Sequence, residues 1–123
     1  MKQLILEKIV PIQGDLVLKH LGMTPEDRKL LTEEVEVILN CAASVNFNEP
    51  LRDALQINYF GSLRVLDLAH ECKKLICMTH VSSTFVNSNQ EPGTTISEEL
   101  HESSVDPESY ITSISEMNPQ ALE

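Results

Sequence analysis

Small and hydroxyl-bearing side chains end two apolar runs of this 123-residue sequence. The run at 37–43 passes into Ala-Ala-Ser at 42–44, and the run at 75–83 passes into Ser-Ser-Thr at 82–84. A hydroxyl can donate a hydrogen bond to a carbonyl oxygen, and small side chains let a bound molecule approach the backbone. In open α/β sheets, ligands bind outside the carboxyl ends of the strands. If both runs are parallel strands, the binding site of this protein is expected where they end.

The two runs have the continuous hydrophobic pattern of buried parallel strands, which we predict at 35–40 and 75–81. Between them, apolar residues from Leu51 to Cys72 recur mostly at three- and four-residue steps, which is typical of a long amphipathic helix. Gly61 interrupts the apolar face of this helix, and we interpret it as a point of close approach to the sheet or a loop. Strand, helix and strand together predict a βαβ unit.

Two further elements are predicted before this unit. The β-branched run at 8–13 favours a strand that is closed by a turn at 14–15. The hydroxyl of Thr24 followed by Pro25 and two acidic residues predicts a helix that begins there and ends at residue 32 or 33. The strands therefore number three in this prediction, and they lie side by side.

The composition changes from about Ser88 onward. Ser, Thr, Pro and acidic residues dominate, and residues 91–123 contain no Lys or Arg. Such a segment buries little apolar area, so we expect loops with at most a weak helix at 107–117. The predicted fold class is α/β, a partial Rossmann-type doubly wound parallel sheet that lacks its first βα turn and its C-terminal part. Residues 1–87 form the partial domain, and residues 88–123 are its acidic, loop-rich continuation.

The net charge of −10 and the scattered Lys and Arg residues exclude nonspecific binding to nucleic acid or to an anionic membrane. Cys41, Cys72 and Cys77 lie within or beside apolar segments without a CxxC spacing, so we expect reduced, buried thiols in an intracellular protein. The His and Cys spacings predict no metal site. An apolar span long enough for a membrane segment is not found in the sequence.

Five sequence blocks occur in one order and resemble the alcohol-forming fatty acyl-CoA reductases, which are extended short-chain dehydrogenases/reductases. The resemblance covers most of residues 9–87 and continues weakly through the acidic segment. The blocks are IVPIQGDL at 9–16, LGMTPEDRKLL at 21–31, NCAASVNFNEPLRDA at 40–54, INYFGS at 57–62 and HVSSTFVN at 80–87. The resemblance implies a Rossmann-type reductase that uses NADPH to convert a fatty acyl-CoA, through an aldehyde, into a fatty alcohol.

The resemblance also implies roles for individual residues. Asp15 would accept a hydrogen bond from the adenine amino group with Leu16 beside the ring, and Ser83 would be the catalytic hydroxyl that binds the substrate carbonyl oxygen. The cofactor-binding residues that it implies are Asp15, Leu16, Ala42, Ala43, Ser44 and Asn58.

The residues themselves leave alternatives open at several of these positions. Asp15 also fits a turn-capping role, and small residues end many buried strands. An amide on the apolar helix face, such as that of Asn58, must be hydrogen-bonded, so a structural role is as reasonable as a catalytic one. Ser83 is preferred as the catalytic hydroxyl, although the Ser-Ser-Thr run also allows its neighbours Ser82 and Thr84. His80 is interpreted as a core histidine.

Two motifs that this chemistry needs are not in the sequence. A glycine-rich phosphate-binding turn does not precede Lys8, and neither Tyr59 nor Tyr110 has a Lys four residues later. We therefore expect an incomplete polypeptide that neither reduces acyl-CoA nor binds NADPH alone. The alternatives are a non-catalytic truncated or degenerate copy, or a different extended short-chain dehydrogenase. For the complete family member, the resemblance implies association with peroxisomes or with the endoplasmic reticulum membrane.

Overall fold

A parallel pair of strands forms the centre of the fold in the computed structural model, which describes residues 7–99, 101 and 105–116. Strand β1 spans Val37–Asn40 and strand β2 spans Cys77–His80. Val37 lies opposite Cys77, and Asn40 lies opposite His80. The predicted parallel pairing is confirmed, and each strand is shorter than predicted.

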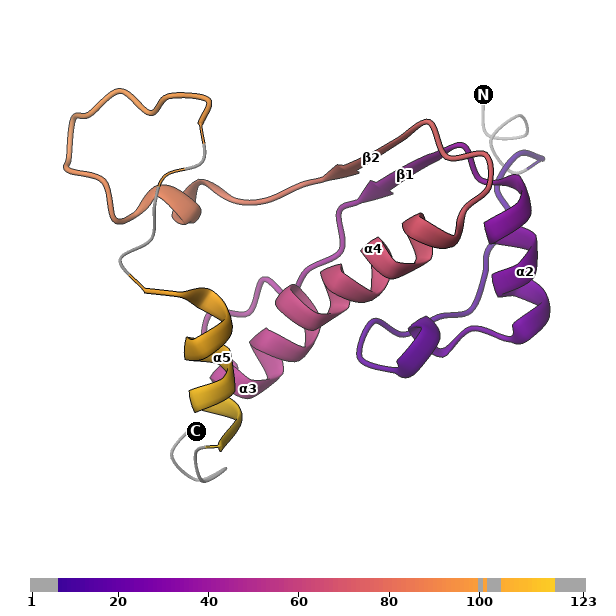
Figure 1. The fold of residues 1–123 in the computed structure, drawn as a ribbon, viewed down its shortest axis with the longest axis horizontal. Helices are drawn as coiled ribbons and strands as arrows, with labels where there is room; N and C mark the ends of the chain where they lie inside the picture. Colours follow the sequence, from indigo (N-terminus) through magenta and orange to yellow (C-terminus); the bar gives the residue numbers. More distant parts are fainter. Residues whose placement is uncertain (1–6, 100, 102–104, 117–123) are drawn as a thin grey trace.

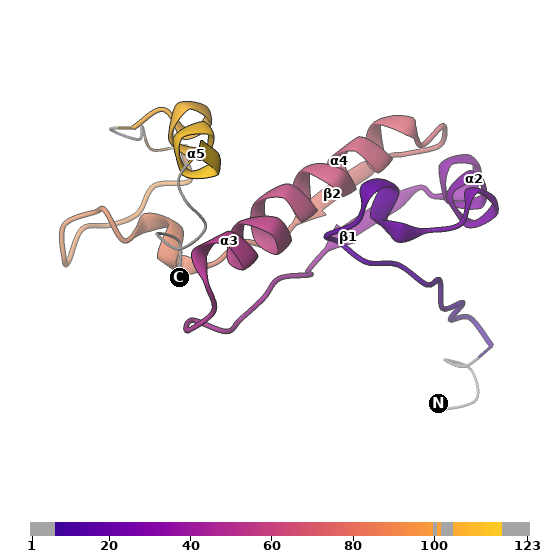
Figure 2. The same ribbon diagram turned by 90° about the horizontal axis from the view of Figure 1, so that it is seen from below.

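The crossover between the strands is one continuous helical rod that runs along both of them (Figures 1 and 2). It consists of α3 (Leu51–Ala54), a π-helical segment η2 (Leu55–Phe60) and α4 (Gly61–Glu71). The wider π-helical turns change the backbone hydrogen bonding, and side chains of α4 bond to carbonyl groups of η2. Ser62 Oγ donates to the Asn58 carbonyl at 2.8 Å, and Arg64 Nη1 donates to the Gln56 carbonyl at 3.3 Å. The predicted crossover helix is thus confirmed, with a π-helical segment that the periodicity did not reveal.

Helix α2 (Pro25–Glu34) begins as the sequence predicts. The hydroxyl oxygen of Thr24 accepts a hydrogen bond from the Asp27 backbone N–H at 3.1 Å. Before it, the short helical turn η1 (Lys19–Gly22) has left-handed backbone at His20, Leu21 and Gly22. This turn places Leu21 in a small apolar core with Val65 and Leu68 of α4.

The predicted strand at 8–13 is wrong for the described residues. This segment has no strand pairing, and the side chains of Ile9 and Val10 are 61% and 74% exposed. A strand needs a neighbour for its backbone N–H and C=O groups, and the described chain offers no partner strand beside it. Consecutive strands need not be neighbours in such sheets: in the doubly wound order 3-2-1-4-5-6, two other strands lie between strands 3 and 4. The three predicted strands therefore do not lie side by side.

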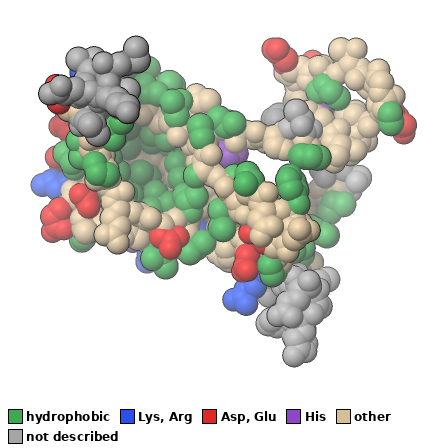
Figure 3. Space-filling model, turned by 180° about the vertical axis from the view of Figure 1, so that it is seen from behind, with side chains coloured by type: hydrophobic (Ala, Val, Ile, Leu, Met, Phe, Trp, Pro, Cys, Tyr) green, Lys and Arg blue, Asp and Glu red, His purple; other side chains and the backbone are tan. Residues whose placement is uncertain are grey.

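One face of the β1–β2 pair is bare in the described structure. Helix α4 covers the face that carries the buried Asn40, whereas Leu39 on the opposite face is 69% exposed. Hydrophobic side chains gather on the side of the molecule seen from behind (Figure 3). Cys41 and Cys77 are exposed because this face of the strand pair is uncovered, so the expectation that both are buried is wrong. All three cysteines are free thiols, as predicted.

The chain after β2 is mostly irregular. A short helical turn η3 (Thr84–Asn87) is followed by turns and extended backbone to residue 99, and α5 spans Pro107–Glu116. The weak helix predicted at 107–117 is confirmed through residue 116, and Met117 lies outside the described residues. The division into residues 1–87 and 88–123 stays a prediction.

An ion pair fastens α2 to α4. Arg28 donates from Nε and Nη2 to the two carboxylate oxygens of Glu71 at 3.0 and 2.7 Å. The hydrogen bond from Arg28 lowers the pKa of Glu71 below its ordinary value. Two parallel hydrogen bonds define the geometry of this pair, although Glu71 is half exposed and the pair is therefore partly screened by water.

The Glu71→Gln variant is expected to be less stable than the wild type near neutral pH, by under about 1 kcal/mol. Because the folded-state pKa of Glu71 is lowered, the carboxylate stabilises the fold above its unfolded-state pKa, and this contribution is lost as the pH falls through the folded-state value. Urea denaturation over a series of pH values measures the difference. Glu33→Gln is the control, because its carboxylate lies 3.6 Å from an exposed Lys73. A Glu71→Gln deficit that is equally large in acid would contradict this account.

Cys72 is expected to be the slowest of the three cysteines to react with a thiol reagent. Burial raises the pKa of the Cys72 thiol, with the Glu71 carboxylate adding to the effect, whereas Cys41 and Cys77 are exposed. Mass spectrometry of peptides after timed alkylation should show Cys72 modified at least about tenfold more slowly. Equal rates at all three positions would show that α2 and α4 do not stay packed together in solution.

Candidate functional site

A buried amide joins the carboxyl ends of the two strands. Asn40 is the last residue of β1 and is only 5% exposed. Its Nδ2 lies 3.1 Å from Nδ1 of His80 on β2 and 3.4 Å from Oγ of Ser62 on α4. This one side chain therefore fixes both strand ends and the start of α4 relative to one another. Asn40 is not among the site residues predicted from the sequence, although a polar residue that ends an apolar run was the available signal.

The directions of these hydrogen bonds follow from the chemistry of their partners. Ser62 donates its hydroxyl hydrogen to the Asn58 carbonyl, so its oxygen accepts from the amide nitrogen of Asn40. The Asn40 carbonyl oxygen accepts from the Ala42 backbone N–H at 3.4 Å. Since an amide nitrogen only donates, Nδ1 of His80 must accept, and the ring hydrogen of the neutral histidine is on Nε2. His80 is exposed at the strand end, so its interpretation as a core histidine is wrong.

Asn58 holds the turn that follows β1. Its Oδ1 accepts from the Ser44 backbone N–H at 2.8 Å, and its Nδ2 donates to the Ser44 carbonyl at 3.4 Å. The side chain is exposed rather than buried in the helix face, because the π-helical segment directs it toward this turn. These two bonds are structural, which is one of the two roles left open for Asn58. Ala42 and Ala43 are exposed in the same turn.

The turn at Asp15 lies at the same edge of the sheet. Leu16 packs against Gly61, where an added Cβ would lie 3.2 Å from the Leu16 Cβ, and Arg64 Nη1 donates to the Leu16 carbonyl at 2.8 Å. The predicted close approach at Gly61 is thus confirmed and involves a loop. Asp15 Oδ1 accepts from the Val17 backbone N–H at 2.9 Å, so Asp15 does cap its turn. Leu16 contacts the helix with part of its surface, and Asp15 is exposed.

Ser83 follows β2 and is exposed at the start of η3. Its Oγ accepts from the Phe85 backbone N–H at 3.1 Å, which leaves the hydroxyl hydrogen of Ser83 available as a donor. The Phe85 ring meets the Phe47 ring edge to face, with 5.6 Å between centroids. This contact, absent from the sequence predictions, brings the loops after β1 and β2 together.

A cavity of about 440 Å³ lies between the Asp15 turn and the start of the crossover. It adjoins the Asp15 turn at Val17, and most of its lining comes from α3 and η2. The lining residues are Val17, Glu49, Arg52, Asp53, Gln56 and Ile57. The structure thus brings the turns at Asp15, Ala42–Ser44 and Ser83 to one edge of the sheet, with open space beside the first of them.

Within residues 7–99, 101 and 105–116, no group of three or more His, Cys, Asp or Glu side chains is arranged to hold a metal ion. Across the same described ranges, none of the helices has the length and apolarity needed to span a membrane.

Comparison with known proteins shows the family of this chain. Residues 1–121 match the model of an NAD-binding family described as male sterility protein. The chain belongs to this family. The fatty acyl-CoA reductase resemblance and the partial Rossmann-type fold predicted from the sequence are confirmed by this match. The family name indicates a nicotinamide dinucleotide as the cofactor class.

Proteins similar to this chain come from animals and plants. A Drosophila melanogaster protein assigned as a fatty acyl-CoA reductase is 39% identical over 117 residues, which are 95% of this chain and 22% of that protein. Fatty acyl-CoA reductase 1 of Xenopus laevis is 36% identical over 91% of this chain and 21% of its own length. Fatty acyl-CoA reductase 8 of Arabidopsis thaliana is 40% identical over 73% of this chain and 18% of its own length. The chain thus spans about a fifth of the relatives it matches.

Asn58→Ala is expected to release the Ser44 turn. Both hydrogen bonds to the Ser44 backbone come from the Asn58 side chain, so the Ser44 amide should exchange with solvent at least about tenfold faster in the variant. Amide hydrogen exchange followed by NMR measures this rate. Asn48→Ala is the matched control, because the Asn48 side chain is exposed in the same loop without a hydrogen bond to another described residue. Unchanged Ser44 exchange in Asn58→Ala would refute the role of this side chain.

Proposed function

We propose that this chain is the nucleotide-binding part of an NADPH-dependent, alcohol-forming fatty acyl-CoA reductase. The observation that carries the proposal is a single edge of the sheet, in a chain whose relatives are named fatty acyl-CoA reductases. At this edge Arg64 bonds to the turn at 14–16, Asn58 bonds to the turn at 42–44, and Asn40 bonds to His80, which ends β2 just before residues 82–84. The substrate class is a long-chain fatty acyl-CoA, and the product is a fatty alcohol. We propose peroxisomal or endoplasmic reticulum association for the complete protein.

The residues of this edge fit a dinucleotide. One carboxylate oxygen of Asp15 bonds within its turn, and the other has no hydrogen bond to a described residue, so it can accept from the adenine amino group. The alanines at 42–43 present no side-chain bulk, which lets the cofactor approach the backbone of a turn that Asn58 holds still. Leu16 is partly exposed and can pack an apolar edge against the adenine ring. NADPH, when bound, supplies the hydride.

Ser83 is the residue that we assign to the substrate carbonyl. Its oxygen accepts from the Phe85 N–H, and this polarises the hydroxyl and strengthens it as a donor. A hydroxyl hydrogen bond of this kind orients the carbonyl and stabilises negative charge as it develops on the oxygen. The hydroxyl does not itself provide the proton. Tyr59 and Tyr110 are followed at the fourth position by Leu63 and Ile114, so neither tyrosine has the Lys partner that this proton transfer needs.

A chimera tests the proposal. Residues 1–121 replace the matching segment of Xenopus laevis fatty acyl-CoA reductase 1, and fatty alcohol formed from a long-chain acyl-CoA is measured with NADPH or NADH. We expect NADPH-dependent alcohol formation, and Ser83→Ala should lower kcat at least about 100-fold because it removes an oxyanion donor. Ser88→Ala is the matched control, since Ser88 is an exposed serine after η3.

The outcomes separate the alternatives. A chimera that folds with the melting temperature of the parent enzyme but forms no alcohol would favour the non-catalytic copy. A large loss in Ser82→Ala with an active Ser83→Ala would move the catalytic position by one residue. Equal rates with NADH would contradict NADPH as the cofactor. The 123 residues alone are expected to form no alcohol, because the proton donor is not among them.

A further inference from the structure

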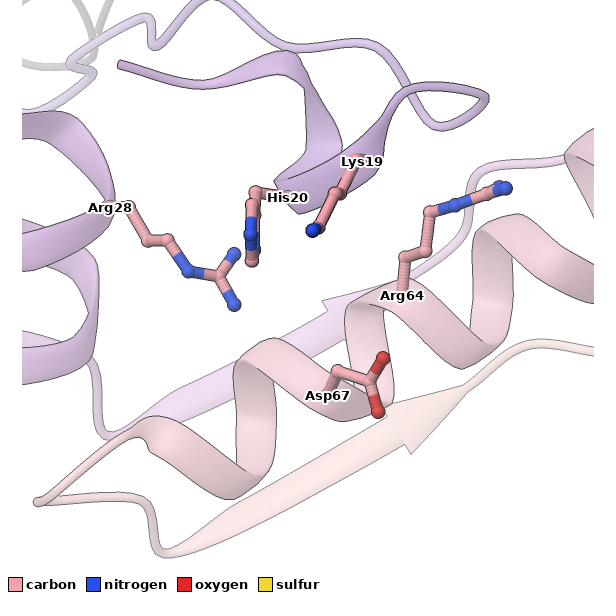
Figure 4. A pocket seen from close by; sticks show the side chains of 5 residues that line it. All are labelled: Lys19, His20, Arg28, Arg64 and Asp67. Carbon is pink, nitrogen blue, oxygen red and sulfur yellow. The ribbon is translucent and has the colours of Figure 1, made fainter. Parts of the chain in front are cut away.

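A second cavity lies between η1, α2 and α4, apart from the turns at 42–44 and 82–84. Its volume is about 340 Å³, and Lys19, His20, Arg28, Arg64 and Asp67 line it. The side chains of Lys19, His20 and Arg28 point into it, whereas Arg64 extends along α4 away from its centre (Figure 4). Two neighbouring elements, η1 and α2, thus direct nitrogen-bearing side chains to one space beside α4.

The charge of this cavity opposes that of the chain. The protein has a net charge of −10, yet three of its nine Lys and Arg residues line this one cavity, together with His20. Asp67 is the one carboxylate of the lining, and Glu71 is occupied by its ion pair with Arg28. In the described part of the chain, no ion pair joins Lys19 or Asp67 to another side chain. The cavity therefore gathers cationic and imidazole nitrogen atoms in a chain whose charged residues are mostly acidic.

Arg28 has hydrogen-bonding capacity that its ion pair does not use. Nε and Nη2 donate to Glu71, whereas Nη1 is buried and has no hydrogen-bond partner among the described residues. A buried N–H group without a partner is costly, and in native proteins such a group usually meets a water molecule or a ligand. Because the Glu71 pair fixes the guanidinium plane, the orientation of Nη1 is fixed as well.

The backbone of η1 is strained where it supplies the other two donors. His20 and Leu21 have φ angles of 53° and 59°, in the left-handed region that is unfavourable for residues other than glycine. Burial of Leu21 in the core offsets part of this cost. The turn directs Leu21 into the core while Lys19 and His20 face the cavity, and such local strain is found most often at ligand sites.

We propose that this cavity binds a phosphate monoester, with Lys19, His20 and Arg28 as donors to the phosphate oxygens. Asp67, on the same cavity wall, accepts from a hydroxyl of the ligand. A phosphorylated ribose has both groups, and it occurs as the 3′-phosphate end of coenzyme A and as the 2′-phosphate end of NADPH. Assignment to either coenzyme rests on the proposed function, whereas phosphate binding itself does not. Free orthophosphate shares the same chemistry.

Inorganic phosphate is the first probe. Titration of the full chain in a phosphate-free buffer of low ionic strength, followed by calorimetry and by ³¹P NMR, should show saturable binding of one phosphate. Lys19→Gln should weaken it about tenfold, because it removes a charge-assisted hydrogen bond. Lys29→Gln is the matched control, since Lys29 is exposed on α2 beside Arg28 but does not line the cavity. Circular dichroism checks that both variants are folded.

Absence of saturable binding, or an equal loss in both lysine variants, would overturn the proposal, since the second result reports net charge alone. Adenosine 3′,5′-bisphosphate, adenosine 2′,5′-bisphosphate and orthophosphate are then compared. Tighter binding of the first or second assigns the site to coenzyme A or to NADPH, and equal binding assigns it to free phosphate. Repeating the variant pair in the reductase chimera separates the proposals. An active chimera without phosphate binding refutes only this site, and an inactive one that binds phosphate refutes only the reductase.

Discussion

The buried amide of Asn40 is the constraint on which the carboxyl edge depends. The side chain bonds to His80 on the neighbouring strand and to Ser62 on the crossover helix, and Ser62 bonds in turn to the carbonyl of Asn58. Asn58 then holds the turn at Ser44. The donors and acceptors of this series match, because the two N–H groups of the Asn40 amide meet two acceptors and the Ser62 hydroxyl meets one. A buried polar network that is fully satisfied favours one geometry over its alternatives, which apolar packing alone does less well.

This polar network matters more here because the described apolar core is small. The buried hydrophobic residues are Leu21, Val65, Leu68, Ala69 and Ile114, and one face of the strand pair is uncovered. Two paired strands are marginal by themselves, so the crossover helix must supply most of the packing. Within this helix Ser62 bonds to the Asn58 carbonyl, while Asn58 and Arg64 bond the helix to the turn at Ser44 and to the turn at Leu16. The turns at the carboxyl edge are therefore positioned by hydrogen bonds, and the crossover helix carries several of the side chains that make them.

Local sequence signals predicted the elements whose causes are local. The cap at Thr24, the amphipathic crossover and the two parallel strands follow from capping chemistry and periodicity. The strand at 8–13 failed because strand formation depends on a partner, which a single run of β-branched residues cannot reveal. The exposure of Asn58 was missed because one extra residue per turn in η2 rotates that side chain off the predicted face. Asn40 was overlooked since its partners, Ser62 and His80, are 22 and 40 residues away.

The acidic character of the chain is compatible with an anionic cofactor, because an extended polyanion and a small anion need different arrangements of positive charge. A nucleic acid or membrane surface presents charge over a wide area and needs cations spread to match it, which this sequence lacks. A dinucleotide or phosphate group is small, and charges beyond about 8 Å are largely screened at physiological ionic strength. Such a small anion interacts only with nearby groups. In this chain these are the backbone turn that Asn58 holds at the carboxyl edge and the cationic side chains between η1, α2 and α4. Net charge thus selects against extended polyanions, while local geometry decides which small anions are bound.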